Sequence, residues 1–130
     1  MDEPLWISVK VALALHARQV AEHGGEPGVR EPELLASAIA KPQQRLHYEP
    51  SSSLFQLAAA YASGIAKNHP FVDGNKRTAF VVYRLFLLRN GLTLSASKTE
   101  RYLSMLQLAA GELSEDEFAK WLSENTVPIS

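Results

Sequence analysis

Nine consecutive residues near the middle of the chain combine side chains that together could handle a phosphate group. The segment reads His69-Pro70-Phe71-Val72-Asp73-Gly74-Asn75-Lys76-Arg77. A histidine can accept a proton near neutral pH, and a carboxylate beside a phosphate is a common ligand of Mg²⁺. Lysine and arginine supply the positive charge that stabilises phosphate oxygens during transfer. A base, a metal ligand and two cations in one short segment predict transfer of a phosphate-containing group.

The segment lies directly before a predicted helix, which adds backbone groups to the site. The first turn of a helix has unpaired N–H groups, and these, together with the helix dipole, attract anions. Gly74 has no side chain, so a phosphate could approach the backbone closely. Lys76 and Arg77 fall in the first turn, where a positive charge opposes the dipole. This placement is explained if an anion binds between them.

Each of these residues also has an ordinary structural explanation. Asp73 could be only the N-cap of the helix, and a single histidine such as His69 is commonly structural. A glycine–asparagine pair can form a simple turn, and the two cations could be solvated surface charges. The chemical interpretation is favoured because all of these explanations would have to coincide in one short segment.

Hydrophobic periodicity and boundary residues predict an all-α fold of about six helices and no strand, forming a single domain over residues 1–130. The first four helices are expected at residues 8–23, 32–40, 53–68 and 75–90. Capping boxes that begin at Ser97 and Ser114 open the last two. The apolar run over residues 79–88 makes the fourth helix the predicted central, buried one.

Two segments outside these helices are expected to be irregular. Pro42 should end the second helix, and prolines and consecutive serines then predict a surface loop over residues 41–52. The residues after Asn125 are predicted to fray at the end of the chain.

Composition excludes several other classes of protein. The chain has 130 residues, 46% of them hydrophobic and 21% charged, which is typical of a soluble globular domain. A net charge of −1 argues against broad binding to nucleic acid, and the absence of cysteine excludes disulfides and thiolate zinc sites. Apolar stretches are too short to cross a membrane, and the acidic start is unlike a signal peptide. We therefore expect a cytoplasmic protein.

The segment at residues 69–77 resembles the signature of the Fic/Doc superfamily. It departs from the Fic pattern at two positions, because Lys76 replaces a second glycine and Phe80 replaces a second arginine. Both departures are similar to the Doc branch, which is named for "death on curing" toxins. Residues 24–42 also look like the N-terminal half of Doc proteins, so the resemblance covers most of the chain.

The resemblance implies a fold, an activity and roles for the residues. Fic enzymes transfer a nucleotide monophosphate to a protein hydroxyl, whereas Doc toxins use ATP to phosphorylate a threonine of elongation factor Tu and arrest translation. By this resemblance His69 is the catalytic base and Asp73 holds Mg²⁺. The ATP phosphates would be held by the next four residues, Gly74, Asn75, Lys76 and Arg77. Lys76 is also expected to act in catalysis. By the same resemblance, a lysine at this position goes with ATP bound in a reversed orientation, which presents the γ-phosphate.

The resemblance also implies a partner, an antitoxin that blocks the active site, because we find no self-inhibitory Fic-type helix in this chain. Two alternatives stay open: a Fic-like nucleotidyltransferase that performs AMPylation, and a catalytically silent Fic-fold protein that acts by binding.

Three features receive weaker predictions. Lys67 could add a phosphate contact, although a surface position is favoured, and His16 is expected to be structural and near the site. Residues 41–45 could take the place of the target-docking flap of Fic proteins, or could be a simple connector.

Overall fold

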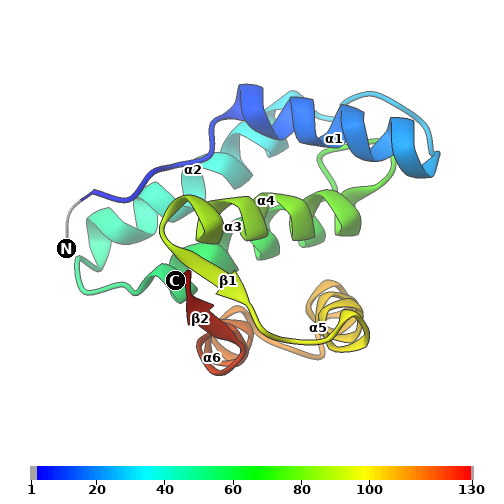
Figure 1. The fold of residues 1–130 in the computed structure, drawn as a ribbon. Coiled ribbons are helices and arrows are strands. Elements are labelled where there is room, and N and C mark those ends of the chain that lie inside the picture. Colours follow the sequence, from blue (N-terminus) through cyan, green and yellow to red (C-terminus); the bar gives the residue numbers. More distant parts are fainter. Residues whose placement is uncertain (1–2, 130) are drawn as a thin grey trace.

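A computed structural model describes residues 3–129, which form six helices and a small two-stranded sheet (Figure 1). The helices are α1 (Val9–His23), α2 (Pro32–Tyr48), α3 (Leu54–Asn68), α4 (Asn75–Arg89), α5 (Lys98–Ala110) and α6 (Glu115–Glu124). The strands are β1 (Leu92–Leu94) and β2 (Thr126–Pro128). The predicted six-helix organisation is confirmed. No helix in the described part of the chain is long and apolar enough to cross a membrane.

Helix α3 is the centre of the fold. Every residue from 57 to 66 is buried, and α2, α4, α5 and α6 all pack against this helix. Most of its buried side chains are small, so the neighbouring helices can approach closely. The sequence predicted the helix at residues 75–90 as the central one, and this was wrong. Helix α4 keeps one face exposed, which carries Lys76 and Arg77, whereas the alanine-rich α3 is covered on all sides.

Gly64 marks the closest approach between α2 and α3. A Cβ atom added there would lie 3.1 Å from both Cα and Cβ of Ala38. We expect Gly64→Val to lower the free energy of unfolding by roughly 3 kcal/mol, because the added methyl groups overpack this contact. Ala36→Val, on the exposed face of α2, is the control and should change stability by about 0.5 kcal/mol or less. Urea denaturation of the two variants measures the difference, and equal stabilities would contradict tight packing at Gly64.

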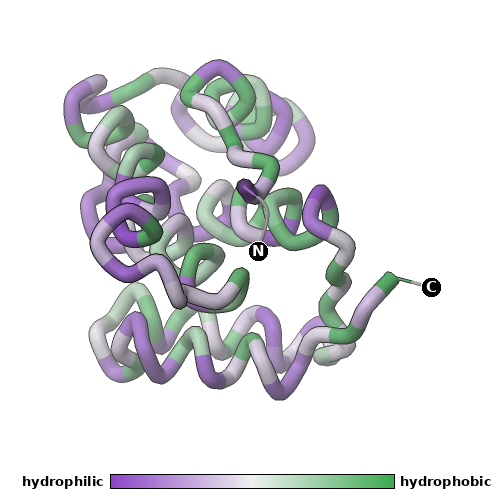
Figure 2. The backbone as a smooth tube through the Cα atoms, turned by 90° about the vertical axis from the view of Figure 1, so that its left-hand side faces the viewer, coloured by the Kyte–Doolittle hydropathy of each residue, from purple (hydrophilic) through white to green (hydrophobic). Residues whose placement is uncertain are grey.

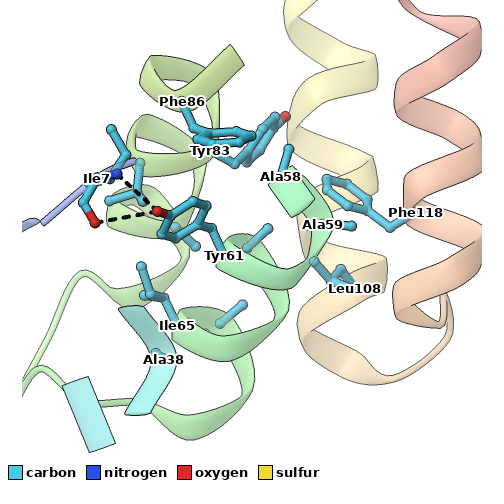
Figure 3. Packing of buried hydrophobic residues seen from close by; sticks show 14 of the residues in the cluster. Ile7, Ala38, Ala58, Ala59, Tyr61, Ile65, Tyr83, Phe86, Leu108 and Phe118 are labelled. Carbon is cyan, nitrogen blue, oxygen red and sulfur yellow. Dashed lines mark hydrogen bonds between the residues drawn. The ribbon is translucent and has the colours of Figure 1, made fainter. Parts of the chain in front are cut away.

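Aromatic side chains fill the core on either side of α3 (Figure 3). Tyr83 of α4 packs edge-on against Phe118 of α6, with ring centroids 5.4 Å apart. On the other side, the Tyr61 hydroxyl accepts the N–H of Ile7 at 2.9 Å and donates to its carbonyl oxygen at 3.3 Å. Burial raises the pKa of Tyr61 to about 12, so this hydroxyl stays protonated and ties the N-terminal segment to the core.

Helix α2 continues through Pro42 to Tyr48, so the loop predicted over residues 41–52 was wrong for its first eight residues. Pro42 lacks an N–H for the helix ladder, but its ring is buried. The second half of α2 is also held by ion pairs to α6. Lys41 and Arg45 both pair with Glu115, and Arg45 also contacts Asp116 at 3.1 Å. Residues 41–45 are therefore part of a helix and not a connecting loop.

Residues 126–129 are paired with the segment around β1 and not frayed, which corrects both the predicted fraying and the prediction of no strand. In β2, Val127 lies opposite Thr93 of β1 in an antiparallel pair. Two further hydrogen bonds flank the pair, from Ser95 N–H to the Asn125 carbonyl and from Ile129 N–H to the Gly91 carbonyl.

Elsewhere, hydrophobic and hydrophilic positions alternate along the outer helices, as expected for helices buried on one side (Figure 2).

Candidate active site

A cleft of about 700 Å³ opens between the loop before α4, the first three turns of α4, and α5. It is lined on the loop and α4 side by His69, Val72, Asp73, Gly74, Asn75, Lys76, Arg77, Phe80 and Arg84. On the α5 side it is lined by Lys98, Arg101, Tyr102, Met105 and Leu106. The six site residues predicted from the sequence thus all line one cleft, whereas Lys67 is exposed and lies outside its lining.

His69 ends α3 in an unusual backbone conformation. Its φ of 50° and ψ of 57° are left-handed, and it is the one non-glycine residue with positive φ within residues 3–129. Such a conformation persists only when the surroundings hold it. The guanidinium of Arg30 does so, because Nε donates to the His69 carbonyl at 2.8 Å and Nη2 donates to the Asn68 carbonyl at 2.9 Å. Arg30 thereby fixes the backbone position from which the His69 side chain extends.

The loop between α1 and α2 holds the rest of the 69–74 segment. Arg30 N–H donates to the Pro70 carbonyl at 2.8 Å, and Val72 N–H donates to the Gly28 carbonyl at 3.1 Å. Val29 and Phe71 form an isolated antiparallel bridge between the two segments. This pairing explains why residues 24–31, far from the segment in sequence, are part of the construction of the site.

His16 of α1 packs against the segment, as was expected from the sequence. Its ring is buried and stacks on Phe71, with centroids 3.9 Å apart and planes within 6°. Nε2 of His16 lies 2.8 Å from the carbonyl oxygen of Asp73. A carbonyl can only accept, so Nε2 carries the proton and donates it. His16 therefore positions Asp73, two residues before the start of α4.

The first turn of α4 is open toward the cleft. Four other helices are preceded by an N-cap serine whose hydroxyl accepts a backbone N–H: Ser8, Ser53, Ser97 and Ser114. The N-cap of α4 is instead Gly74, at a φ of 74°, which has no side chain to cap the helix. Within residues 3–129 no acceptor faces the backbone N–H groups of residues 75–77. These donors, at the positive end of the helix dipole, form a site for an anion.

Asn75 contributes its side chain to the loop and not to the cleft. Its Oδ1 accepts the Phe71 N–H at 3.0 Å, and its Nδ2 donates to the Phe71 carbonyl at 2.9 Å. The residue is 8% exposed. It was predicted to bind phosphate, and the group that it leaves for an anion is its backbone N–H.

Asp73 combines a structural role with an accessible position. Its Oδ1 accepts the Gly74 N–H at 2.8 Å, and Oδ2 accepts the Glu26 N–H at 3.2 Å. Each oxygen retains a further lone pair. Among the described residues no group of three metal-ligating side chains occurs, so the chain offers one carboxylate here. That donor set fits Mg²⁺, which commonly takes one or two carboxylates and obtains its other ligands from phosphates and water.

Five cations line the cleft, and three of them were missed from the sequence. Besides Lys76 and Arg77, these are Arg84 of α4 and Lys98 and Arg101 of α5. In the part of the chain that the structure describes, none of the five forms an ion pair. Arg84 lies seven residues after Arg77 and thus on the same face of α4, a spacing visible in the sequence. That α5 faces α4 could be learned only from the fold.

Comparisons with known proteins agree with this geometry. Residues 6–87 match the Fic/DOC family. Over 116 residues the chain is 36% identical to the protein of Escherichia phage P1 named protein kinase doc. The aligned residues make up 89% of this chain and 91% of that protein. Over 74 residues it is 43% identical to the protein of Mycolicibacterium smegmatis named toxin Doc. Here the aligned residues make up 56% of this chain and 57% of that protein. The chain therefore belongs to the Fic/DOC family and to its Doc branch.

Proposed function

We propose that this protein is a Doc-like toxin that transfers the γ-phosphoryl group of ATP to a protein hydroxyl. The observation that carries the proposal is that His69 and the open first turn of α4 line the same cleft. The name of the phage P1 relative, protein kinase doc, supports the same class of reaction. We expect a cytoplasmic protein whose target is a threonine of elongation factor Tu, so that phosphorylation arrests translation.

In the proposed reaction His69 accepts the proton of the target hydroxyl. The hydroxyl oxygen attacks the γ-phosphorus, the bond from that phosphorus to the bridging oxygen breaks, and ADP leaves with the electron pair. The N–H groups of residues 75–77, with Lys76 and Arg77, stabilise the charge on the phosphate oxygens. Asp73 would hold Mg²⁺, which neutralises part of the phosphate charge when bound.

Two residues favour phosphoryl transfer over nucleotide transfer. Lys76 places a point charge where a Fic enzyme has a glycine. Phe80 places an aromatic ring in the cleft wall where a Fic enzyme has an arginine, and this ring packs edge-on against Tyr83 with centroids 5.4 Å apart. Because these changes alter both charge and shape beside the first turn of α4, we infer that ATP presents its γ-phosphate to His69.

The decisive experiment uses ATP labelled at either the α or the γ phosphorus, with Mg²⁺ and purified elongation factor Tu. We expect label to transfer from the γ position only. Transfer from the α position would instead establish AMPylation, and no transfer from either position to any protein of a bacterial extract would favour the silent binding protein.

The proposed partner is an antitoxin that covers the cleft and prevents access of target and ATP. Expression of the chain alone should arrest bacterial growth, and co-expression of the reading frame beside its gene should restore growth. Restoration that leaves γ-phosphoryl transfer by the purified complex unchanged would contradict blockage of the active site.

A further inference from the structure

A second group of cations lies farther along the cleft from His69. Arg84 follows Arg77 by seven residues, which is about 10 Å along the axis of α4. Arg101 lines the facing wall on α5, and Lys98 lies one turn before it. Arg84 and Arg101 are both partly buried, whereas Lys98 is exposed. The sequence pattern of the family signature ends at Phe80, so these residues lie outside it.

The guanidinium of Arg84 has no partner within residues 3–129. Its Nε is buried and makes no hydrogen bond, and none of the ion pairs among the described residues includes this side chain. Buried donors are almost always paired, and those without a partner in the protein commonly face a ligand or water. Arg84 lies one turn after Phe80, and both residues line the α4 side of the cleft.

Arg101 is held in place by the backbone that leads into α5. Its Nε donates to the Ala96 carbonyl at 3.0 Å, and Nη2 donates to the Leu94 carbonyl at 3.4 Å. Neither contact neutralises its charge. The nearest acidic side chain on its own helix, Glu100, accepts the Ser97 N–H in the capping box. Among residues 3–129, the only carboxylate in the cleft lining is that of Asp73, which accepts hydrogen bonds from the backbone N–H groups of Gly74 and Glu26.

Arg84 and Arg101 line the same cleft, and both charges act on the buried hydroxyl of Tyr83. Its hydroxyl points from α4 toward α5 (Figure 3), is fully buried, and has no hydrogen-bond partner among the described residues. Burial raises the pKa of this hydroxyl, and the charges of Arg101 and Arg84 both oppose that shift. The phenol stays neutral, and within residues 3–129 neither Arg84 nor Arg101 forms an ion pair with an acidic side chain.

We propose that Arg84 and Arg101 form a second anion subsite, which holds phosphate groups of a polyphosphate ligand two helical turns from the first turn of α4. The first turn binds the phosphate nearest His69, and the second subsite binds the phosphates toward the nucleoside end. The identity of the ligand as a nucleoside triphosphate rests on the proposed function, but the subsite itself depends only on this arrangement of charges. Lys98, which is exposed and also lines the cleft, adds positive charge.

Binding of inorganic tripolyphosphate to the full chain tests this subsite without any transfer reaction. We expect Arg84→Met, which keeps the aliphatic stem, to bind tripolyphosphate about tenfold more weakly than wild type by calorimetry. Arg84→Lys should recover part of that loss, since it restores the charge without the fork of donors. Lys10→Met on α1, an exposed lysine outside the cleft, is the control and should bind like wild type. In wild type, the Nε–H resonances of Arg84 and Arg101 should shift during the titration.

Three results would overturn the subsite. One is binding by Arg84→Met within twofold of wild type, and another is equal weakening in Arg84→Met and Arg84→Lys, which would indicate lost packing instead of lost charge. The third is unchanged Nε–H resonances at saturating tripolyphosphate. If the subsite is confirmed but no γ-label is transferred to protein, the proposed kinase activity fails alone. If label is transferred but Arg84→Met binds normally, the subsite fails alone.

Discussion

Replacement of His69 by asparagine is expected to reduce phosphoryl transfer from ATP by roughly 10²–10⁴-fold, the contribution typical of a positioned general base. Asparagine is chosen because it tolerates the left-handed conformation observed at this residue, with a φ of 50°. Its amide cannot take up a proton near neutral pH. The backbone of the site should therefore remain in place while the base is lost. The initial rate of transfer from γ-labelled ATP to elongation factor Tu measures the effect.

His47→Asn is the matched control, because His47 is an exposed histidine on α2 outside the cleft lining. It should transfer phosphate at the wild-type rate. ATP binding and thermal unfolding of His69→Asn should stay near wild type, since in the proposed site α4 holds the phosphates, and the imidazole makes no hydrogen bond within residues 3–129. A His69→Asn rate within tenfold of wild type would show that another group accepts the proton.

Features that depend on neighbouring residues in the sequence were predictable. The serine caps of α1, α3, α5 and α6 are local, because each hydroxyl bonds a backbone N–H three residues later. The site segment is local for the same reason. Its residues lie within one turn of the chain and the start of one helix, so they must lie together in any fold that forms α4.

Features that depend on distant partners were not predictable. Pro42 would end an isolated helix, but Arg45 three residues later pairs with Glu115 of α6, which stabilises the continued helix. The tail pairs with β1 only because α6 returns it to that edge. The same holds for the cleft wall, since Arg101 becomes a site residue only when α5 packs opposite α4. The wrong choice of central helix has a related cause. The alanines of α3 are less hydrophobic than the large apolar side chains at residues 79–88 of α4, but their small size lets neighbouring helices cover α3 on every side.

The second large effect is expected from Arg30, which acts on His69 without lining the cleft. Arg30→Met keeps the stem but removes the donors to the Asn68 and His69 carbonyls. These carbonyls lie at the C-terminal end of α3, where a cation is favourable and helical partners are lacking. We expect kcat for phosphoryl transfer to fall by about 10²-fold, because a small displacement of a catalytic group has an effect of that order. The lost hydrogen bonds should lower the free energy of unfolding by about 1–2 kcal/mol.

A purely structural role for Arg30 predicts a different pattern. It would lower the melting temperature and leave kcat of the folded fraction unchanged. A positioning role instead lowers kcat while the KM for ATP stays close to wild type, because the first turn of α4 is anchored separately by Asn75 and His16. Arg18→Met, which removes an exposed arginine paired with Glu22 on α1, is the control and should change neither quantity. Because the left-handed backbone at His69 has to be held by its surroundings, we expect Arg30→Met to lose rate even at temperatures where it is fully folded.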